Sequence, residues 1–325
     1  MTQLKFNDDV FTVSSGQTVL ETLLGNDIEV PNNCRAGACQ SCLMQVTKGK
    51  VPEAAQKGLK DSFKAKGYFL ACSCIPEENI DICIPDSSQL KTQATVKEIN
   101  KLSDDVIELK IQTEDQYDYF AGQFVTLWRD DNLGRSYSLA SLPENDHLLT
   151  FHIRVIPNGA FSGWVDNELQ VNDTMWVQGP AGDCFYTQGN AEQNLLLIGT
   201  GTGLAPLYGI VRDALQSGHT GDILLFHGAL NQYGLYLHDH LTALSEQYIH
   251  FKYLPCVVEG NVDMPENITE GDIAKVIFEK VPKPSGWKAF LCGNPELVND
   301  LRKKIYLAGC NMKDIYSDPF IPSEN

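Results

Sequence analysis

The stretch Cys34-Arg-Ala-Gly-Ala-Cys39-Gln-Ser-Cys42 contains three cysteines separated by four and two residues, and Cys72 follows after 29 more residues. The chain has ten cysteines, and the other six are scattered. In a reducing compartment, clustered cysteines are more often metal ligands than disulfide partners. Three thiolates from one loop can surround a compact metal group only if the backbone turns tightly. Gly37 permits such a turn and leaves backbone N–H groups free to face negative charge on the group.

The alternative interpretation of this loop is a structural zinc site. Zinc sites favour paired C-x2-C knuckles, whereas the loop offers one such pair and two more distant cysteines. The spacing instead resembles that of plant-type [2Fe–2S] ferredoxins. Cys74 is a second candidate for the fourth ligand, but Leu70, Cys72 and Pro76 match the Leu-x-Cys-x-x-x-Pro pattern of those ferredoxins. The resemblance implies a β-grasp domain over residues 1–88 with a [2Fe–2S] cluster on Cys34, Cys39, Cys42 and Cys72.

Composition and charge exclude some classes of partner and location. The 325 residues carry a net charge of −17, which argues against nucleic acid as a partner because phosphate binding needs a basic surface. No apolar run approaches the length of a membrane span. The N-terminus has neither the basic nor the apolar segment of a signal peptide. We therefore expect a cytoplasmic protein that is not membrane-bound and is monomeric when free.

Two further domains follow a polar linker near residues 86–94. Between 94 and 188, short strands separated by turn residues predict an antiparallel barrel with one helix at Phe161–Leu169. The expected strands are Val106–Ile111, Gln123–Trp128, Arg135–Ala140, Leu148–Ile153 and Thr174–Val177. Between 192 and 325, buried strands alternate with helices, which predicts a doubly wound parallel sheet. Its expected strands are Leu195–Ile198, Ile223–Phe226, Phe251–Val258 and Ala289–Leu291.

The barrel region contains a sequence suited to a flavin. Along a strand, Arg135 and Tyr137 share one face while Ser138 faces the other way, so a guanidinium and an aromatic ring point to the same side. Such a sequence is common by chance, but Arg135-Ser136-Tyr137-Ser138 resembles the R-x-Y-S motif of the ferredoxin–NADP reductase family. The resemblance implies that Arg135 binds the pyrophosphate of FAD, that Tyr137 stacks on its isoalloxazine and that Ser138 is a catalytic residue bonded to flavin N5.

Two more matches to that family follow in the same order. His152-Ile153-Arg154 and Gly159-Ala160-Phe161-Ser162 resemble its second flavin motif, in which a glycine turn and a serine at a helix start meet the pyrophosphate. Gly179-Pro-Ala-Gly182 stands where the family has G-P-x-G. The three matches together predict an FAD-binding barrel.

The last domain contains a glycine turn between a strand and a helix. In Leu195-Leu-Leu-Ile-Gly-Thr-Gly-Thr-Gly-Leu-Ala-Pro206, the glycines let a pyrophosphate approach the backbone at a helix N-terminus. The pattern is not G-x-G-x-x-G, because Leu204 replaces the last glycine, but it fits the glycine-and-proline variant of the same family. The resemblance assigns coenzyme binding to Gly199, Thr200, Gly201, Thr202 and Gly203.

Two motifs near the C-terminus complete the resemblance. Cys292-Gly293-Asn-Pro295 resembles the family's C-G-x-P, in which the cysteine lies against the nicotinamide and helps to orient hydride transfer. This implies a catalytic Cys292 and a coenzyme-binding Gly293; a core cysteine before a turn is the alternative. Phe320 stands where relatives often cover the flavin, although five residues follow it. Residues 228–240 contain no Lys or Arg to bind a 2′-phosphate, and Leu230 replaces the family's usual basic residue, which favours NADH over NADPH.

The order of ferredoxin domain, flavin barrel and nucleotide domain resembles the reductase components of methane and phenol monooxygenases and of benzoate dioxygenase. The resemblance implies electron transfer from NADH through FAD and the cluster to an oxygenase (hydroxylase) component or its ferredoxin. A deoxysugar dehydrase, a free electron carrier or a redox sensor without turnover remain alternatives. We expect the partner to dock on a partly apolar patch around Ala36, Ala38 and Met44.

Overall fold

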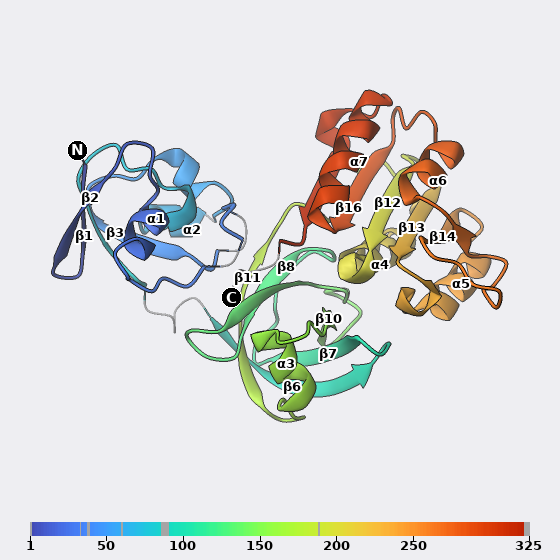
Figure 1. Cartoon of the computed structure of the whole chain (residues 1–325), viewed down its shortest axis with the longest axis horizontal. Helices are drawn as coiled ribbons and strands as arrows, with labels where there is room; N and C mark the ends of the chain where they lie inside the picture. Colours follow the sequence, from blue (N-terminus) through green and yellow to red (C-terminus); the bar gives the residue numbers. More distant parts are fainter. Residues whose placement is uncertain are drawn as a thin grey trace.

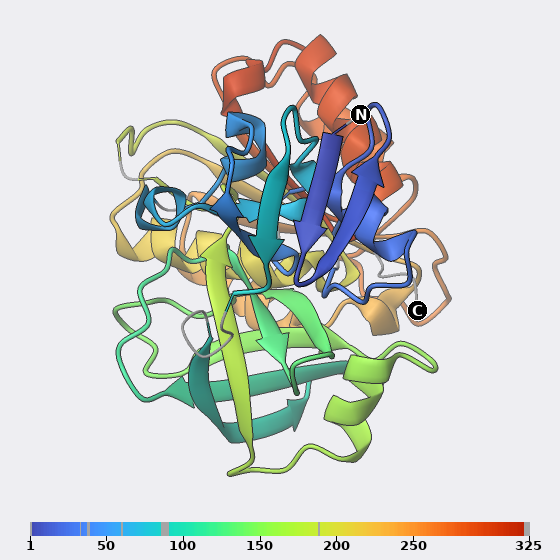
Figure 2. The same cartoon turned by 90° about the vertical axis from the view of Figure 1, so that its left-hand side faces the viewer.

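The computed structural model describes residues 2–32, 34–37, 40–59, 61–85, 91–187 and 189–321. Figure 1 shows three lobes, with the N-terminal lobe at the left, the barrel at the lower centre and the C-terminal lobe at the upper right. Figure 2, turned by 90°, shows the N-terminal lobe lying over the barrel and in front of the C-terminal lobe. In the described part of the chain, no helix has both the length and the apolar character of a membrane span.

The N-terminal lobe is a mixed five-stranded sheet in the order β2-β1-β5-β3-β4. β1 pairs in parallel with β5 and antiparallel with β2. A capping box starts the first helix: Thr18 and Glu21 form it, with Glu21 N donating to Thr18 Oγ1 at 3.2 Å. The elements are β1 Thr2–Phe6, β2 Asp9–Val13, α1 Val19–Leu24, β3 Leu43–Lys48, α2 Asp61–Ala65, β4 Tyr68–Leu70 and β5 Ile80–Cys83, with 3₁₀ turns η1 Glu53–Gln56 and η2 Ala71–Ser73.

The middle lobe is an antiparallel six-stranded sheet in the order β10-β7-β6-β11-β8-β9. A bridge between Leu139, just after β9, and Phe151 on β10 joins its two edges, so the sheet closes into the predicted barrel. Phe161 and Val165 on the helix Ala160–Asn167 are buried against the barrel core. The elements are β6 Thr92–Lys101, β7 Val106–Thr113, β8 Phe124–Trp128, β9 Gly134–Ser138, β10 Leu149–Arg154, α3 Ala160–Asn167 and β11 Thr174–Ala181.

The C-terminal lobe is an all-parallel sheet in the order β15-β14-β13-β12-β16-β17. Alternate residues of its central strand pack in different cores: Leu195 and Leu197 face α4 and α5, while Leu196 and Ile198 face α6 and α7. Helices therefore cover both faces, as predicted. The elements are β12 Leu195–Thr200, η4 Gly201–Gly203, α4 Leu204–Gln216, β13 Ile223–Ala229, η5 Gln232–Gly234, α5 His238–Gln247, β14 Phe251–Val257, β15 Thr269–Glu270, α6 Ile273–Lys280, β16 Lys288–Gly293, α7 Pro295–Leu307, η6 Met312–Asp314 and β17 Ile315–Pro319.

Strand order reverses between β12 and β16, because the chain leaves β12 toward β13 and returns on the other side of β12 to form β16. In open α/β sheets, the carboxyl ends of the strands at such a reversal form the usual ligand crevice. Gly201 follows β12 and Gly293 ends β16, so both predicted coenzyme motifs reach this point.

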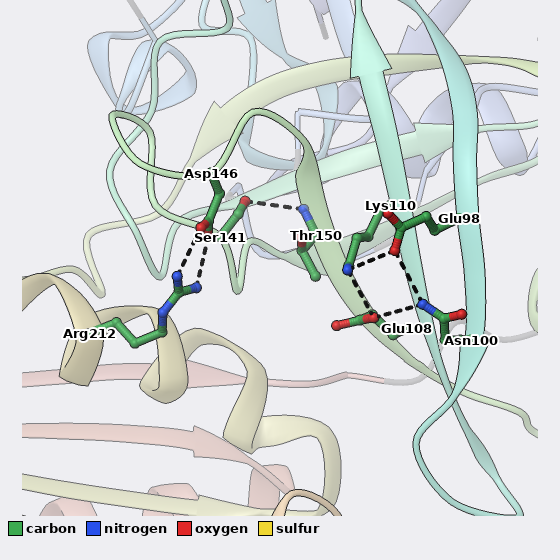
Figure 3. Close-up of polar contacts among 8 residues, drawn as sticks. All are labelled: Glu98, Asn100, Glu108, Lys110, Ser141, Asp146, Thr150 and Arg212. Atoms are coloured by element: carbon green, nitrogen blue, oxygen red, sulfur yellow. Dashed lines mark hydrogen bonds and ion pairs between the residues drawn. The ribbon is translucent and has the colours of Figure 1, made fainter. Parts of the chain in front are cut away.

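Specific polar contacts join the lobes. Arg212 on α4 makes two hydrogen bonds to the carboxylate of Asp146 in the barrel, at 2.7 and 2.8 Å (Figure 3). Between the barrel and the N-terminal lobe, Trp128 Nε1 donates to Gln178 Oε1 at 3.0 Å, and Gln178 Nε2 donates to the carbonyl of Gln40 at 3.2 Å. Gln40 lies inside the cysteine loop, so this relay ties that loop to the barrel.

Candidate active site

The structure places two of the four predicted cluster ligands, Cys42 and Cys72, in contact. The Cys42 side chain hydrogen-bonds to Cys72, and Cys34 is close enough for its charge to act on Cys72. Hydrogen bonds from Cys42 and from the Gly37 backbone outweigh burial and lower the pKa of Cys72 to about 7. Thiolate character and nearby N–H donors are what an iron–sulfur group requires. These residues fit such a group; Cys39 lies outside the described residues.

The surroundings of Cys74 differ from those of Cys72. Its side chain is fully buried in the core of the N-terminal lobe, and burial raises its pKa to about 12. A buried neutral thiol packed among apolar side chains is a structural residue rather than a metal ligand. The geometry therefore favours Cys72, the alternative that the ferredoxin pattern preferred.

The cysteine loop faces the barrel on one side. Cys34 packs against Phe124 and Ala181, which belong to barrel strands β8 and β11. Ala36 lines the cleft between the lobes. The expected docking patch is wrong in one member, because Met44 is fully buried as an inward-facing residue of β3. Ala38, the third member, lies outside the described residues.

A cleft of about 1570 Å³ lies where the three lobes meet, and side chains from all three line it. A volume of this order accommodates extended ligands larger than a drug-sized molecule. Most of the predicted cofactor-binding residues contribute to its walls. They are Arg135, Ser136, Tyr137, Ser138, His152, Arg154, Gly159, Ala160, Phe161, Ser162, Thr200, Gly201, Thr202, Gly293 and Phe320.

Four predicted residues lie outside the lining. Ile153 is fully buried in the barrel core, because strand alternation turns it away from the face that carries His152 and Arg154. Gly199 and Gly203 have a packing role: a Cβ on Gly199 would come within 2.8 Å of Leu207, and one on Gly203 would collide with the Cys292 carbonyl. Cys292 lies behind the cleft wall with 1% of its surface exposed.

The barrel wall fits the pyrophosphate and ring of a flavin. The ring of Tyr137 lies 5.5 Å from that of Phe161, so the strand and the helix form one aromatic wall. No side chain caps the N-terminus of α3, which leaves N–H groups of its first turn available to an anion. Ser162 does not point its hydroxyl into the cleft; its Oγ accepts from Ile156 N at 3.1 Å and so holds the glycine turn. Arg135 lines the cleft beside this wall.

His152 connects the barrel to the coenzyme lobe. Its Nδ1 lies 3.2 Å from the hydroxyl of Tyr236, which precedes α5. Burial lowers the pKa of His152 to about 3, so the imidazole is neutral at physiological pH. A neutral ring whose Nδ1 is engaged can position its neighbours but cannot supply a positive charge to a phosphate.

The coenzyme wall is formed by the glycine turn after β12. Gly201 has a φ of +53°, and α4 begins at Leu204 without a side-chain cap. Arg154 of the barrel lies across this turn: a Cβ on Gly201 would be 3.0 Å from Arg154 Nη1. Asp105 fixes that guanidinium by accepting from Arg154 Nε at 2.9 Å. Arg154 therefore stands where the barrel and coenzyme walls meet.

Sequence reasoning missed Asp318. This residue lies on β17, lines the cleft and hydrogen-bonds to Ser138 of the barrel. Burial raises the pKa of Asp318 to about 7, against the lowering effect of the Ser138 hydrogen bond. The signal was present in the sequence, because Asp318 stands two residues from both Tyr316 and Phe320, at the period that places strand residues on one face.

Matches to known domains follow the chain in the same order as the three lobes. Residues 5–77 match a 2Fe-2S iron-sulfur cluster binding domain, residues 93–186 an oxidoreductase FAD-binding domain and residues 197–303 an oxidoreductase NAD-binding domain. A [2Fe–2S] cluster, FAD and a nicotinamide coenzyme are therefore the cofactors of this chain, and the zinc alternative is wrong.

Relatives of similar length share this arrangement. The ferredoxin–NAD(P)(+) reductase component of the naphthalene 1,2-dioxygenase system of Pseudomonas putida is 30% identical, with 97% of each chain covered. The reductase subunit of an aromatic O-demethylase from an Amycolatopsis strain is 30% identical, with 95% of each covered. The crystal structure of a reductase from Amycolatopsis is 27% identical and superposes with a TM-score of 0.71 over the whole of both chains. The reductase of a deoxyhexulose dehydrase from Yersinia pestis is 24% identical, with 97% of this chain and 96% of the relative covered.

Proposed function

Because the chain belongs to the family of ferredoxin–NAD(P) reductase components of oxygenase systems, we propose that it carries electrons from NADH to an oxygenase component or its ferredoxin. The observation that supports this most directly is the shared cleft. Cys34 of the cysteine loop, Ser138 of the barrel and Asp318 of the coenzyme lobe all line it. Donor, carrier and acceptor groups held by these walls would lie close to one another in one molecule. We propose 1–88, 94–188 and 192–325 as the domain limits.

In this proposal, FAD when bound takes a hydride from NADH and releases electrons singly, which is the form that a [2Fe–2S] cluster accepts. The residues supply binding and orientation. Tyr137 and Phe161 hold the ring system, the first turn of α3 and Arg135 hold the pyrophosphate, and Arg154 reaches across to the glycine turn. Ser138, whose hydroxyl is oriented by its hydrogen bond to Asp318, would offer that hydroxyl to the bound ring. Cys34, Cys39, Cys42 and Cys72 hold the cluster.

The choice of NADH follows from the end of β13. Leu230 lines the cleft there and is 60% exposed, without a cation between residues 228 and 240 to meet a 2′-phosphate. Asp272 lines the same part of the cleft, and its carboxylate caps α6 by accepting from Ala274 N at 2.7 Å. A fixed carboxylate disfavours a second phosphate nearby.

We propose an oxygenase as acceptor because the relatives with the higher identities serve oxygenase systems, whereas the dehydrase reductase is more distant. A cytoplasmic, monomeric protein that does not bind nucleic acid fits this role. The test is anaerobic stopped-flow mixing of the purified holoprotein with NADH, followed by mixing with a purified oxygenase component or its ferredoxin. Flavin bleaching, then cluster reduction, then reduction of the oxygenase is the expected order. Cluster reduction without any transfer to the oxygenase would refute the proposed acceptor.

A further inference from the structure

Cys184 and Cys292 form a pair of thiols beside the cleft. Their Sγ atoms lie 3.5 Å apart, and both side chains are buried, with 4% and 1% of their surfaces exposed. Cys184 belongs to the segment after barrel strand β11, whereas Cys292 belongs to β16 of the coenzyme lobe. The pair therefore spans the junction between the two lobes.

The backbone at each cysteine is held firmly in place. A Cβ on Gly122 would lie 2.5 Å from the Cys184 carbonyl oxygen and 2.8 Å from Ile210 of α4, so the Cys184 backbone passes between barrel and helix with no spare room. The Cys292 carbonyl is similarly close to Gly203 of the glycine turn. A disulfide requires a sulfur separation of about 2.05 Å, so about 1.5 Å of approach is needed. Because the backbone on both sides is closely packed, rotation of the two side chains would have to supply this approach.

Access to the two sulfurs differs. Cys184 is among the residues that line the cleft, while Cys292 lies behind it. Burial, together with the contact to Cys184, raises the pKa of Cys292, so this thiol stays protonated at neutral pH. A small oxidant that enters the cleft consequently meets Cys184 first, with the Cys292 thiol in contact behind it.

We propose that Cys184 and Cys292 are a redox-sensitive dithiol that hydrogen peroxide converts into a disulfide, and that this disulfide slows hydride transfer to the flavin. In the first step the Cys184 sulfur attacks the peroxide, which forms a sulfenic acid and releases one water. In the second step the Cys292 sulfur displaces the hydroxyl of that sulfenic acid, which forms the S–S bond and releases a second water. The two thiols lose two electrons, which break the peroxide O–O bond, and two protons, which end on the peroxide oxygens as these leave in the two waters.

The second half of the proposal, the effect on hydride transfer, rests on the proposed function. The bond would draw the Cys292 sulfur toward Cys184 and tie β16 to the barrel segment beside the glycine turn. Displacements near 1 Å at a reacting centre cost up to about a hundredfold in rate. We therefore expect reduction of the flavin by NADH to slow by about tenfold or more when the disulfide forms, and to recover when a dithiol reductant is added.

The test uses the holoprotein treated anaerobically with hydrogen peroxide, and in parallel with the thiol oxidant diamide, which spares iron–sulfur groups better. Mass spectrometry of the unreduced digest should find the peptides of Cys184 and Cys292 linked. Stopped-flow mixing with NADH before and after treatment gives the ratio of flavin reduction rates. Iron and acid-labile sulfide are measured in the same samples, so that damage to the cluster is not mistaken for the disulfide.

Cys184→Ser should lose the oxidant-dependent change in this ratio, and so should Cys184→Ala if the serine variant folds poorly. Cys83→Ser is the matched control, because Cys83 lies on β5 of the N-terminal lobe; it should keep the full sensitivity. Absence of the linked peptide from treated wild-type protein would overturn the proposal, and a linked peptide without slower flavin reduction would overturn its functional half. Failure of NADH to reduce the flavin in untreated protein would instead contradict the proposed function.

Discussion

Arg212 holds Asp146 through two nearly equal hydrogen bonds, 2.7 Å from Nη1 and 2.8 Å from Nη2, across the junction between the coenzyme lobe and the barrel (Figure 3). Planar bidentate pairs of this kind fix orientation as well as distance. The Leu142 N–H also donates to Asp146, at 2.9 Å, so the carboxylate is itself positioned by the barrel backbone. The relative placement of the two halves of the cleft depends on this contact.

We predict that Arg212→Gln destabilises the junction by about 1–3 kcal/mol, because it leaves a half-buried carboxylate without its charged partner. Urea unfolding followed by the fluorescence of released FAD measures the change. Lys110→Gln is the control: Lys110 forms its ion pairs with Glu98 and Glu108 of the barrel sheet (Figure 3), and only the longer-range effect of its charge reaches Asp146. Its effect on FAD release should be the smaller of the two.

The same pair predicts a pH dependence. Burial alone would raise the pKa of Asp146, but the hydrogen bonds from Arg212 and from Leu142 N–H lower it below its usual value. A depressed carboxyl pKa contributes stability that is complete above the unfolded pKa of about 4 and is lost as the pH falls through the folded pKa. The stability difference between wild type and Arg212→Gln should therefore be constant near neutrality and shrink below about pH 4. A difference that grows with acid would contradict this assignment.

A second prediction concerns Asp318. Replacing it with Asn keeps the shape of the side chain but removes the carboxylate that orients the Ser138 hydroxyl. We expect flavin reduction by NADH to slow by about tenfold to a hundredfold, with little change in the dissociation constant of NADH, because the residue acts on reacting geometry. Asp314→Asn, in the same C-terminal segment, is the matched control. A weaker NADH affinity with an unchanged rate of flavin reduction would instead indicate that Asp318 contributes to coenzyme binding.

A third prediction tests whether the cluster and the flavin function independently. It also tests whether Cys72 or Cys74 is the fourth cluster ligand. Cys72→Ser should remove the cluster, as measured by iron and acid-labile sulfide, and should abolish transfer to the partner. NADH should still reduce the flavin, because the flavin and coenzyme walls come from other lobes. Cys74→Ser should keep the cluster at some cost in stability, since Cys74 belongs to the core. The opposite pattern would make Cys74 the ligand.

A fourth prediction concerns the coenzyme. Leu230→Arg would place a guanidinium at the exposed end of β13, and we expect kcat/KM for NADPH to rise by about tenfold while that for NADH changes little. Leu230→Gln, which introduces a polar side chain without a charge, should leave the preference for NADH over NADPH unchanged. Adding Asp272→Ser, which removes the carboxylate and keeps a helix cap, should increase the gain further. An unchanged kcat/KM for NADPH in the double variant would mean that the 2′-phosphate does not bind beside Leu230 and Asp272.

The sequence predicted those parts of the fold whose signal is local. Five of the six barrel strands and four strands of the last lobe were expected close to their observed ranges, because burial on one or both faces leaves a pattern along the chain itself. The first barrel strand, β6 (Thr92–Lys101), was not expected. β17 was missed because Ser317, Asp318 and Pro319 are poor strand formers, and their conformation comes from pairing with β16.

The cleft shows the same division between local and non-local information. Motif residues such as Arg135 and Tyr137 were expected there because each motif lies within a few consecutive positions. Cys184 contacts Cys292, 108 residues away, and Cys34 meets Phe124 in another lobe, so neither contact has a signature within one segment. Ile153 was assigned to the cofactor by its place in a motif, although strand alternation already indicated that it faces the core.

The packing of the cysteine loop against Phe124 and Ala181 affects how electrons reach the loop and how they leave it. The barrel already occupies the side of the loop nearest to the flavin cleft, so an outside acceptor has to approach from another edge. Tethering gives the internal step an effective concentration that dilution of the protein leaves unchanged. The rate at which electrons reach the loop is therefore set within each molecule. Only the rate at which they leave it depends on the concentration of the acceptor. Such a reductase can serve a more abundant acceptor as a catalyst, delivering electrons at a rate fixed by its own architecture whenever the acceptor is in excess.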